Sequence, residues 1–372
     1  MSKAVLKNAS YILVHTPDMI VNNGTTCQVE MKTNPDSEFL KVVKNNVRSY
    51  EDVVAYPPNQ AYIGNIHPEE LDNYSQPWFK HKIENASRYG KYGEIQPQAE
   101  FIALMKISDA FDLVKLTKEF TEMVVEKIKA DPIFTEQDLA CFKTGEEFEV
   151  IDALVKNEHS EPLEHEGKLV GCVKRAHDVD LNLTSHVMFE NLVVKASGVL
   201  AARHLTKNAG ISPAEIEYVI ECSEEACGDM NQRGGGNFAK AIAESCGYVN
   251  ATGADMRGFC AGPAHSVIAA AALVKAGVYK NVVVVGGGAT AKLGMNAKDH
   301  IKKEAPVLED VLGGFAILVS EDDGVSPYLN TDLVGRHTVG TGSSPQAVIT
   351  SLITMPLDKG NLKITDIDKY SV

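Results

Sequence analysis

A chain of 372 residues is longer than one simple hydrophobic core usually needs, so it suits one large duplicated α/β unit or two domains. Its 44% hydrophobic and 23% charged residues are typical of a soluble globular protein, and no apolar run approaches the roughly 20 residues of a membrane span. The formal net charge of −14 argues against nucleic acid or anionic lipid as a partner, because both would be repelled.

The N-terminal residues and the cysteines favour a cytoplasmic protein. The first residues, MSKAVLKNASYILVHTPDM, lack the order of charged, apolar and small residues that marks a secretory signal. The seven cysteines are odd in number and scattered, which does not suit a disulfide framework, so we expect reduced thiols. They are Cys27, Cys141, Cys172, Cys222, Cys227, Cys246 and Cys260.

The first 180 residues differ from the rest of the chain in their turn signals and in the periodicity of their apolar residues. SYILVHTP (residues 10–17) predicts a buried strand that ends at its proline. Residues 49–98 contain many turn signals and no sustained period, which predicts a long irregular surface segment. Helical spacing then appears in residues 99–132 and again in residues 146–157. We interpret this region as an insertion packed on the main domain rather than as an independent domain.

From residue 181 onward, helices and strands alternate, which is typical of a sheet covered by helices. Ser212 and Glu215 predict a capping box before the first of these strands. Four consecutive valines, residues 282–285, indicate a strand that is buried on both faces. The predicted helices are residues 185–210 and 236–247, and the predicted strands are residues 217–222, 250–259, 280–288 and part of 307–324.

Two short segments are similar to each other. ISPAEIEYVI (residues 211–220) and LKITDIDKYSV (residues 362–372) share an aliphatic residue, a short loop, an acid–Ile–acid triplet and the start of a strand. Each of them follows a predicted helix. The repeat predicts a duplicated fold whose second copy has only begun at Val372, with on the order of 100 further residues to come.

Cys260 stands at the start of an alanine-rich helix in RGFCAGPAHSVIAAAALVKAG (residues 257–277). Backbone N–H groups at a helix N-terminus are unpaired and carry partial positive charge, so a thiol there is favoured as a nucleophilic thiolate. Pro263 suits the first turn because its missing N–H would have no helical partner. A backbone N–H of the turn could donate to the oxyanion of a thioester intermediate. Strand, sharp turn, cysteine and small-residue helix together favour a catalytic nucleophile over a small buried cysteine.

These residues resemble the active-site turn of the thiolase superfamily, and within it the ketoacyl synthase III branch. The resemblance rests on GFCAGPAHSVIAAAALVKAGVYKNVVVVGG and runs from about Ser185 to Asp323. Within that branch, RGGGNFAKAIAESCGYVNATGADMRGFCAGPAHS is most similar to the beta subunits of component C of the glycine/sarcosine/betaine reductase complex. So is GGGATAKLGMNAKDHIKKEAPVLEDVLGGFAILVSEDDG, and so is the long segment between the first strand and the first helix.

The resemblance implies a thiolase-like layered α/β/α/β/α fold with four parts. Residues 1–18 would form the first strand, and residues 19–180 a family-specific insertion, irregular and then helical. Residues 181–324 would form the first thiolase-like half with the nucleophile, and residues 325–372 the start of a truncated second half. The resemblance also marks residues 281–285 as a dimer strand, so we expect this apolar strand at a sheet edge, where a second copy of the chain or a related subunit covers it.

The resemblance implies that Cys260 acts in an acyl-transfer subunit. In such complexes a carboxymethyl group on selenoprotein A is released as an acetyl thioester on component C, and inorganic phosphate cleaves it to acetyl phosphate. The implied partners are the alpha subunit of component C, carboxymethylated selenoprotein A and inorganic phosphate, in a homo- or hetero-oligomer without a cofactor or metal. Two alternatives stay open, a condensing enzyme of the ketoacyl synthase III type and a non-catalytic scaffold subunit.

The chain departs from the synthase pattern in two places. Where synthases have GDGAGA, it has EDVLGG (residues 309–314), so local backbone contacts would differ. The histidine and the asparagine or second histidine of the family would lie beyond Val372, so no general base is assigned. We expect His265 to be buried and hydrogen-bonded rather than catalytic, and His337 is a weak candidate for the site.

Three other motifs rank lower. VVVVGGGATAKLG lacks the G-x-G-x-x-G spacing of a nucleotide loop and is better explained as the end of a buried strand. CSEEAC (residues 222–227) has no second Cys or His pair at zinc spacing, so no metal site is expected. RGGGN (residues 233–237) could hold phosphate through backbone N–H groups, although three glycines in a loop are common.

Overall fold

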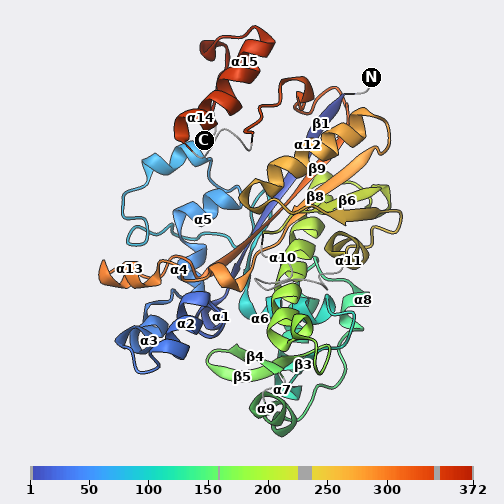
Figure 1. Cartoon of the computed structure of the whole chain (residues 1–372). Coiled ribbons are helices and arrows are strands. Elements are labelled where there is room, and N and C mark those ends of the chain that lie inside the picture. The colour runs from blue at the N-terminus through green and yellow to red at the C-terminus, as the bar shows by residue number, and fades with distance from the viewer. Residues whose placement is uncertain (1–2, 158–159, 225–236, 339–343, 371–372) are drawn as a thin grey trace.

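The computed structural model describes residues 3–157, 160–224, 237–338 and 344–370. Its largest element is a six-stranded sheet with the strand order β2-β1-β9-β8-β6-β7 (Figure 1). Strands β6, β7 and β8 run parallel to one another, whereas β9 is antiparallel to both β8 and β1. The strands are β1 (Ala4–His15), β2 (Ile95–Pro97), β6 (Tyr218–Glu221), β7 (Thr252–Asp255), β8 (Asn281–Gly286) and β9 (Val311–Glu321).

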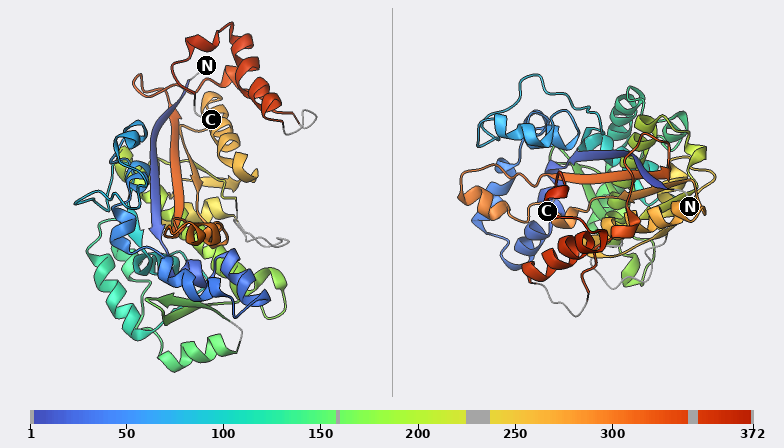
Figure 2. Two further views of the ribbon diagram at one scale, coloured as in Figure 1. Left: turned by 90° about the vertical axis from the view of Figure 1, so that its left-hand side faces the viewer. Right: turned by 90° about the horizontal axis from the view of Figure 1, so that it is seen from above.

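Helices cover both faces of this sheet. The side chains of β8 alternate between the faces, as in any strand. Val283 and Val285 lie in the core that α10 and α11 complete, whereas Val282 and Val284 lie in the core beneath α12. The left-hand view of Figure 2 shows the sheet nearly edge-on, with α12 on one side of it. These helices are α10 (Ser185–Ala209), α11 (Phe238–Ser245) and α12 (Gly262–Lys275).

The predicted ends of the first helix and the turn after it are confirmed. Thr184 caps α10 by accepting a hydrogen bond from the Val187 N–H, and Gly210 ends the helix in the left-handed conformation with φ of 61°. The capping box follows, because the Ser212 N–H donates to Glu215 Oε2 at 2.9 Å.

The structure contradicts the expectation that residues 281–285 form a sheet edge. β8 pairs with β6 on one side and with β9 on the other, so its backbone is already satisfied. Its four valines are fully buried because helices cover both faces. Pairing of this strand with a second copy or with a related subunit is therefore ruled out, and within the described residues the edges of the sheet are β2 and β7.

The region before α10 is richer in structure than the sequence indicates. Its strand β2 joins the large sheet, and three further strands form a small antiparallel sheet in the order β3-β5-β4. The helical block predicted at residues 99–132 is divided into α6 and α7, because β3 lies between them. The additional strands are β3 (Val114–Leu116), β4 (Ser160–His165) and β5 (Lys168–Lys174). The helices are α1 (Pro17–Asn22), α2 (Thr25–Thr33), α3 (Glu38–Val43), α4 (Tyr50–Val54), α5 (Pro57–Tyr62), α6 (Gln98–Ile107), α7 (Lys118–Lys129), α8 (Glu136–Leu139) and α9 (Phe148–Lys156).

The C-terminal segment repeats one local turn of the first half. The Lys363 N–H donates to Asp366 Oδ2 at 2.8 Å, as the Ser212 N–H does to Glu215. The two similar sequence segments thus form the same type of closed turn. Among the described helices, none is both long and apolar enough to span a membrane. The remaining helices are α13 (Ala297–Lys302), α14 (Pro345–Ile349) and α15 (Met355–Gly360).

An ion pair ties the N-terminal region to α10. Arg203 of α10 binds the Asp138 carboxylate of α8 through two hydrogen bonds, Nη1 to Oδ2 at 2.7 Å and Nη2 to Oδ1 at 2.8 Å. The two side chains are only 11% and 6% exposed. Burial alone would raise the pKa of Asp138, but the hydrogen bonds and charge of Arg203 outweigh burial and lower it.

We predict that Asp138→Asn lowers the free energy of unfolding at neutral pH by about 3 kcal/mol, because Arg203 would stay buried without a counter-charge. The folded pKa of Asp138 lies below its unfolded value, so this stabilisation is present above roughly pH 4 and is lost as pH falls further. Urea unfolding at neutral and acidic pH should show a difference that shrinks in acid. Glu126→Gln, which breaks an exposed pair with Lys129, is the matched control. Equal stability of Asp138→Asn and wild type at neutral pH would contradict the prediction.

Candidate active site

The loops that follow three parallel strands lie together at the carboxyl ends of these strands. β6, β7 and β8 share one direction, so their carboxyl ends meet, and in open α/β sheets such edges bind ligands. The loop after β6 is joined to the loop after β8, because the Gly287 N–H donates to Ser223 Oγ at 2.7 Å. Cys260 lies in the loop after β7, between that strand and α12.

The chain makes a sharp turn immediately before Cys260. Phe259 has a φ of 49°, a left-handed conformation that a bulky residue rarely adopts. The short helix η5 (Phe259–Ala261) follows, and α12 then begins at Gly262, with Pro263 in its first turn. The predicted arrangement of strand, turn, cysteine and helix is therefore present. Its geometry is that of a turn that exposes a nucleophile at the end of a strand.

Small residues let α12 begin against the end of β6. A Cβ atom added to Gly262 would lie 3.0 Å from the carbonyl oxygen of Cys222, so a side chain here would require the backbone at Cys222 to shift by a few tenths of an ångström. The amides of the turn are largely used within it, because the Ala261 N–H donates to the Gly258 carbonyl at 3.1 Å and the Gly262 N–H to the Phe259 carbonyl. The oxyanion donor that the sequence suggested is therefore not one of these two amides.

Arg257 fixes the start of the turn to the sheet. Its guanidinium binds the buried Glu221 of β6, with Nη1 to Oε2 at 2.5 Å, and Asp255 of β7, with Nη2 to Oδ2 at 3.2 Å. Asp255 also accepts hydrogen bonds from the N–H groups of Phe238 and Ala239, at the N-terminus of α11. Burial raises the pKa of Glu221, and the charge of Arg257 only partly offsets this.

Glu224 lies beside the exposed Cys260 thiol, and Lys292 lies beside Glu224. Cys260 Sγ is 3.8 Å from both carboxylate oxygens of Glu224, and Lys292 Nζ is 3.7 Å from Glu224 Oε1. A carboxylate at this position can accept the thiol proton, and the ammonium balances its charge. The sequence reasoning missed both residues. The available signal was their position in the loops after β6 and β8, which meet at the edge where Cys260 lies.

Neither candidate histidine is placed as a base. His265 is exposed, so the expectation that it would be buried is wrong. His337 is exposed in the segment after β9. Within the described part of the chain, no hydrogen bond joins either ring to Cys260.

The lower-ranked motifs have mixed outcomes. The glycines after the valine run end the buried strand β8, as expected, and a Cβ atom on Gly287 would lie 2.1 Å from the Val194 carbonyl of α10. Cys222 is buried, but Cys227 and most of RGGGN lie outside the described residues. Glu94, Glu100 and Asp131 form a grouping with metal-ligand spacing, yet the guanidinium of Arg88 already binds all three carboxylates.

We predict that iodoacetamide at neutral pH modifies Cys260 before the buried thiols. Burial raises the pKa of Cys222 and of Cys246 to about 12 and that of Cys27 to about 11, so their thiolates are scarce. Cys141 is exposed and serves as the matched comparison, although partial burial raises its pKa. Peptide mass spectrometry after short exposures gives the order in which the cysteines are alkylated. Labelling of Cys222 as fast as Cys260 would refute the prediction.

We also predict that Phe259→Gly leaves the free energy of unfolding unchanged or raises it by up to about 1 kcal/mol. Glycine adopts a positive φ without strain, and the Phe259 side chain is 79% exposed, so little packing is lost. Phe111→Gly is the control, since Phe111 is 76% exposed without a positive φ and should lose about 0.5 kcal/mol. Equal destabilisation in both variants would argue against strain at the turn.

Some known proteins are similar to the region around Cys260, and one is similar to the whole chain. The family model for 3-oxoacyl-[acyl-carrier-protein] synthase III matches residues 254–335. Beta-ketoacyl-[acyl-carrier-protein] synthase III of Listeria monocytogenes is 36% identical over 95 residues, which cover 25% of this chain and 28% of that protein. A solved priming beta-ketosynthase of a polyketide pathway is 26% identical with a TM-score of 0.27, covering 35% of this chain and 36% of its own. A cerulenin-bound OleA variant of Xanthomonas campestris is 14% identical with a TM-score of 0.36, and the match covers 47% of this chain and 56% of that one.

A longer match extends over every residue. Glycine/sarcosine/betaine reductase complex component C subunit beta of Peptoclostridium acidaminophilum is 63% identical over 375 aligned residues. The match covers 100% of this chain, which spans 73% of the length of that relative. The recognition made from the sequence is thus confirmed: the chain belongs to the family of component C beta subunits of the glycine/sarcosine/betaine reductase complex and has their thiolase-like α/β fold.

Proposed function

We propose that this chain is an acyl-transfer subunit of component C that holds an acetyl thioester on Cys260, which inorganic phosphate releases as acetyl phosphate. The observation that carries the proposal is the exposed thiol at a strained turn, where three parallel strands end. The 63% identity to a component C beta subunit supports the same assignment.

The proposed step exchanges one acyl bond for another. A phosphate oxygen attacks the thioester carbonyl carbon, the carbon–sulfur bond breaks, and sulfur leaves as thiolate while the acetyl group stays on phosphate. Glu224, 3.8 Å from Cys260 Sγ, takes the thiol proton when the thioester forms and returns it after release. Arg257 is not a phosphate ligand in this account, because Glu221 and Asp255 already bind its guanidinium.

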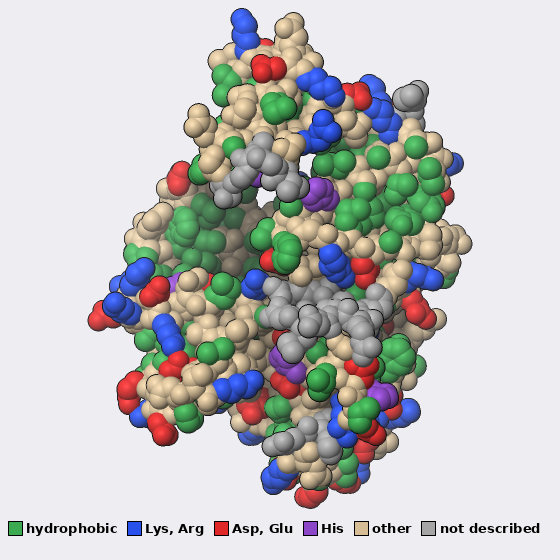
Figure 3. Space-filling view, viewed as in Figure 1, with side chains coloured by type: hydrophobic (Ala, Val, Ile, Leu, Met, Phe, Trp, Pro, Cys, Tyr) green, Lys and Arg blue, Asp and Glu red, His purple; other side chains and the backbone are tan. Residues whose placement is uncertain are grey.

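We propose the alpha subunit of component C and carboxymethylated selenoprotein A as partners. Exposed apolar side chains next to Cys260 in the sequence and on α12 support a covering protein, since Phe259 is 79% and Ile268 of α12 is 39% exposed. Figure 3 shows hydrophobic side chains gathered over the outer face of α12. The proposal also includes an oligomer in the cytoplasm, with residues 19–180 as a family-specific insertion and residues 325–372 as the start of a second thiolase-like half.

Two other functions make different chemical demands. A condensing enzyme, which the partial match to ketoacyl synthases favours, would load Cys260 from an acyl-CoA or acyl carrier and form a carbon–carbon bond. The acidic net charge of −14 is unfavourable for docking an acidic acyl carrier. A scaffold subunit would leave the acetyl group on its partner and would not need the Cys260 thiol.

We predict that the assembled complex, given its amine substrate and reductant without phosphate, accumulates an acetyl adduct on the Cys260 peptide, measured by mass spectrometry. Cys260→Ala should abolish the adduct and lower acetyl phosphate formation by about a thousandfold or more, because the nucleophile is lost. Cys141→Ala is the matched control, since its thiol is also exposed but lies far along the chain in the N-terminal region, and it should keep full activity.

Each alternative has its own signature in the same experiment. An adduct found only on the partner subunit, with full activity in Cys260→Ala, would establish the scaffold function instead. Loading from acyl-CoA with formation of a β-keto product would establish the condensing enzyme.

A further inference from the structure

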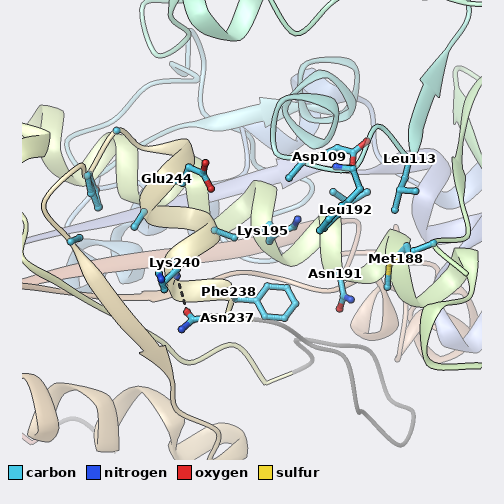
Figure 4. A pocket seen from close by; sticks show the side chains of 18 of the residues that line it. Asp109, Leu113, Met188, Asn191, Leu192, Lys195, Asn237, Phe238, Lys240 and Glu244 are labelled. Atoms are coloured by element: carbon cyan, nitrogen blue, oxygen red, sulfur yellow. Dashed lines mark hydrogen bonds between the residues drawn. The ribbon is translucent and has the colours of Figure 1, made fainter. Parts of the chain in front are cut away.

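A cavity of about 820 Å³ opens between α10, α11 and two segments of the N-terminal region, residues 109–113 and 176–183 (Figure 4). It lies on the α10 face of the sheet, whereas α12 covers the other face. Met188, Leu192 and Phe238 supply an apolar lining. This size is within the range of small-molecule sites.

The rim of the cavity is apolar as well. Phe111 and Val249 line it from two different segments and are 76% and 79% exposed. The apolar surface therefore continues from the interior to the opening. A molecule with an apolar body would cover both.

Asn191 of α10 contributes an unsatisfied acceptor to this cavity. The side chain lines the cavity, is only 8% exposed, and its Oδ1 has no hydrogen-bond partner among the described residues. Buried polar atoms are normally paired, and leaving one unpaired costs roughly 1–3 kcal/mol. A ligand that carries a hydroxyl or N–H group would satisfy it.

Lys195 lies one helical turn after Asn191 and also lines the cavity. Its side chain is half-buried and forms no ion pair with the residues that the structure describes. Burial lowers the pKa of Lys195, and the charge of Asp109 only partly opposes this. The Asp109 carboxylate is already bound to the N–H groups of Phe111 at 3.1 Å and Val114 at 2.7 Å. An anionic ligand would supply the missing counter-charge.

The charges around the cavity disfavour a doubly charged ligand. Two lysines, Lys195 and Lys240, are matched by two acids, Asp109 and Glu244, so the formal charges of the lining cancel. A phosphate ester would bring two negative charges against this neutral lining, whereas a carboxylate brings one.

We propose that this cavity binds a small amphipathic carboxylate that carries a hydroxyl or N–H group near its charged end. The carboxylate pairs with Lys195, the donor group binds Asn191 Oδ1, and the apolar chain lies on Met188, Leu192 and Phe238. The site does not include Cys260, so it stands whether or not the proposed acyl transfer is correct.

Titration calorimetry of the full chain with 3-hydroxydecanoate, decanoate and 1,3-decanediol tests the site. We expect 3-hydroxydecanoate to bind most tightly, because it alone offers both the charge and the donor. Lys195→Met should weaken it roughly tenfold or more, since a hydrogen-bonded charge pair is lost. Lys207→Met, an exposed lysine near the end of the same helix, is the matched control and should change affinity less than about twofold.

Asn191→Leu separates the two polar contacts. It should remove the preference for 3-hydroxydecanoate over decanoate while Lys195 still favours both over the diol. Circular dichroism and thermal unfolding of each variant confirm that it is folded. Absence of binding at millimolar concentration, equal binding of the diol, or unchanged affinity in a folded Lys195→Met protein would each overturn the proposal.

Discussion

The burial of β8 between two strands and two helical layers is the constraint on which the rest of the structure depends. Its backbone is paired on both sides by β6 and β9, and its valines face α10 on one side and α12 on the other. Fixing β8 fixes its parallel neighbours β6 and β7, and with them the edge where their loops meet. Cys260, Glu224 and Lys292 come together there because three strands end together, although they are far apart in the sequence.

Ion pairs next to the turn before Cys260 stabilise its strained backbone. A left-handed Phe259 is unfavourable by itself, so neighbouring interactions must determine this backbone. Arg257 does so by binding Glu221 and Asp255, and Asp255 in turn caps α11. One guanidinium thereby joins β6, β7 and the first turn of α11. The thiol stands on a turn whose position the sheet determines, which suits a reaction that needs a fixed nucleophile.

Local signals in the sequence predicted much of this fold and the turn between strand and helix on which Cys260 lies. Gly210 and the Ser212–Glu215 box act within a few residues, so their outcome does not depend on the rest of the chain. An apolar run cannot tell an interior strand from an edge strand, and for this reason the edge position of residues 281–285 was wrong. His265 was misplaced because the buried positions of α12 recur at Gly262, Ser266 and Ala270, leaving it on the outer side. Glu224 and Lys292 could not be found from spacing alone, since only the meeting of two loops brings them to the thiol.

The kinetic competence of the Cys260 adduct shows whether Cys260 carries the acetyl group during turnover. Complex loaded without phosphate is mixed rapidly with phosphate and quenched at intervals, and acetyl-Cys260 and acetyl phosphate are quantified in each sample. If Cys260 carries the acetyl group, the adduct disappears at least as fast as steady-state turnover and acetyl phosphate appears in equal amount. Decay of the adduct more slowly than turnover, or acetyl phosphate formed while the adduct persists, would contradict it.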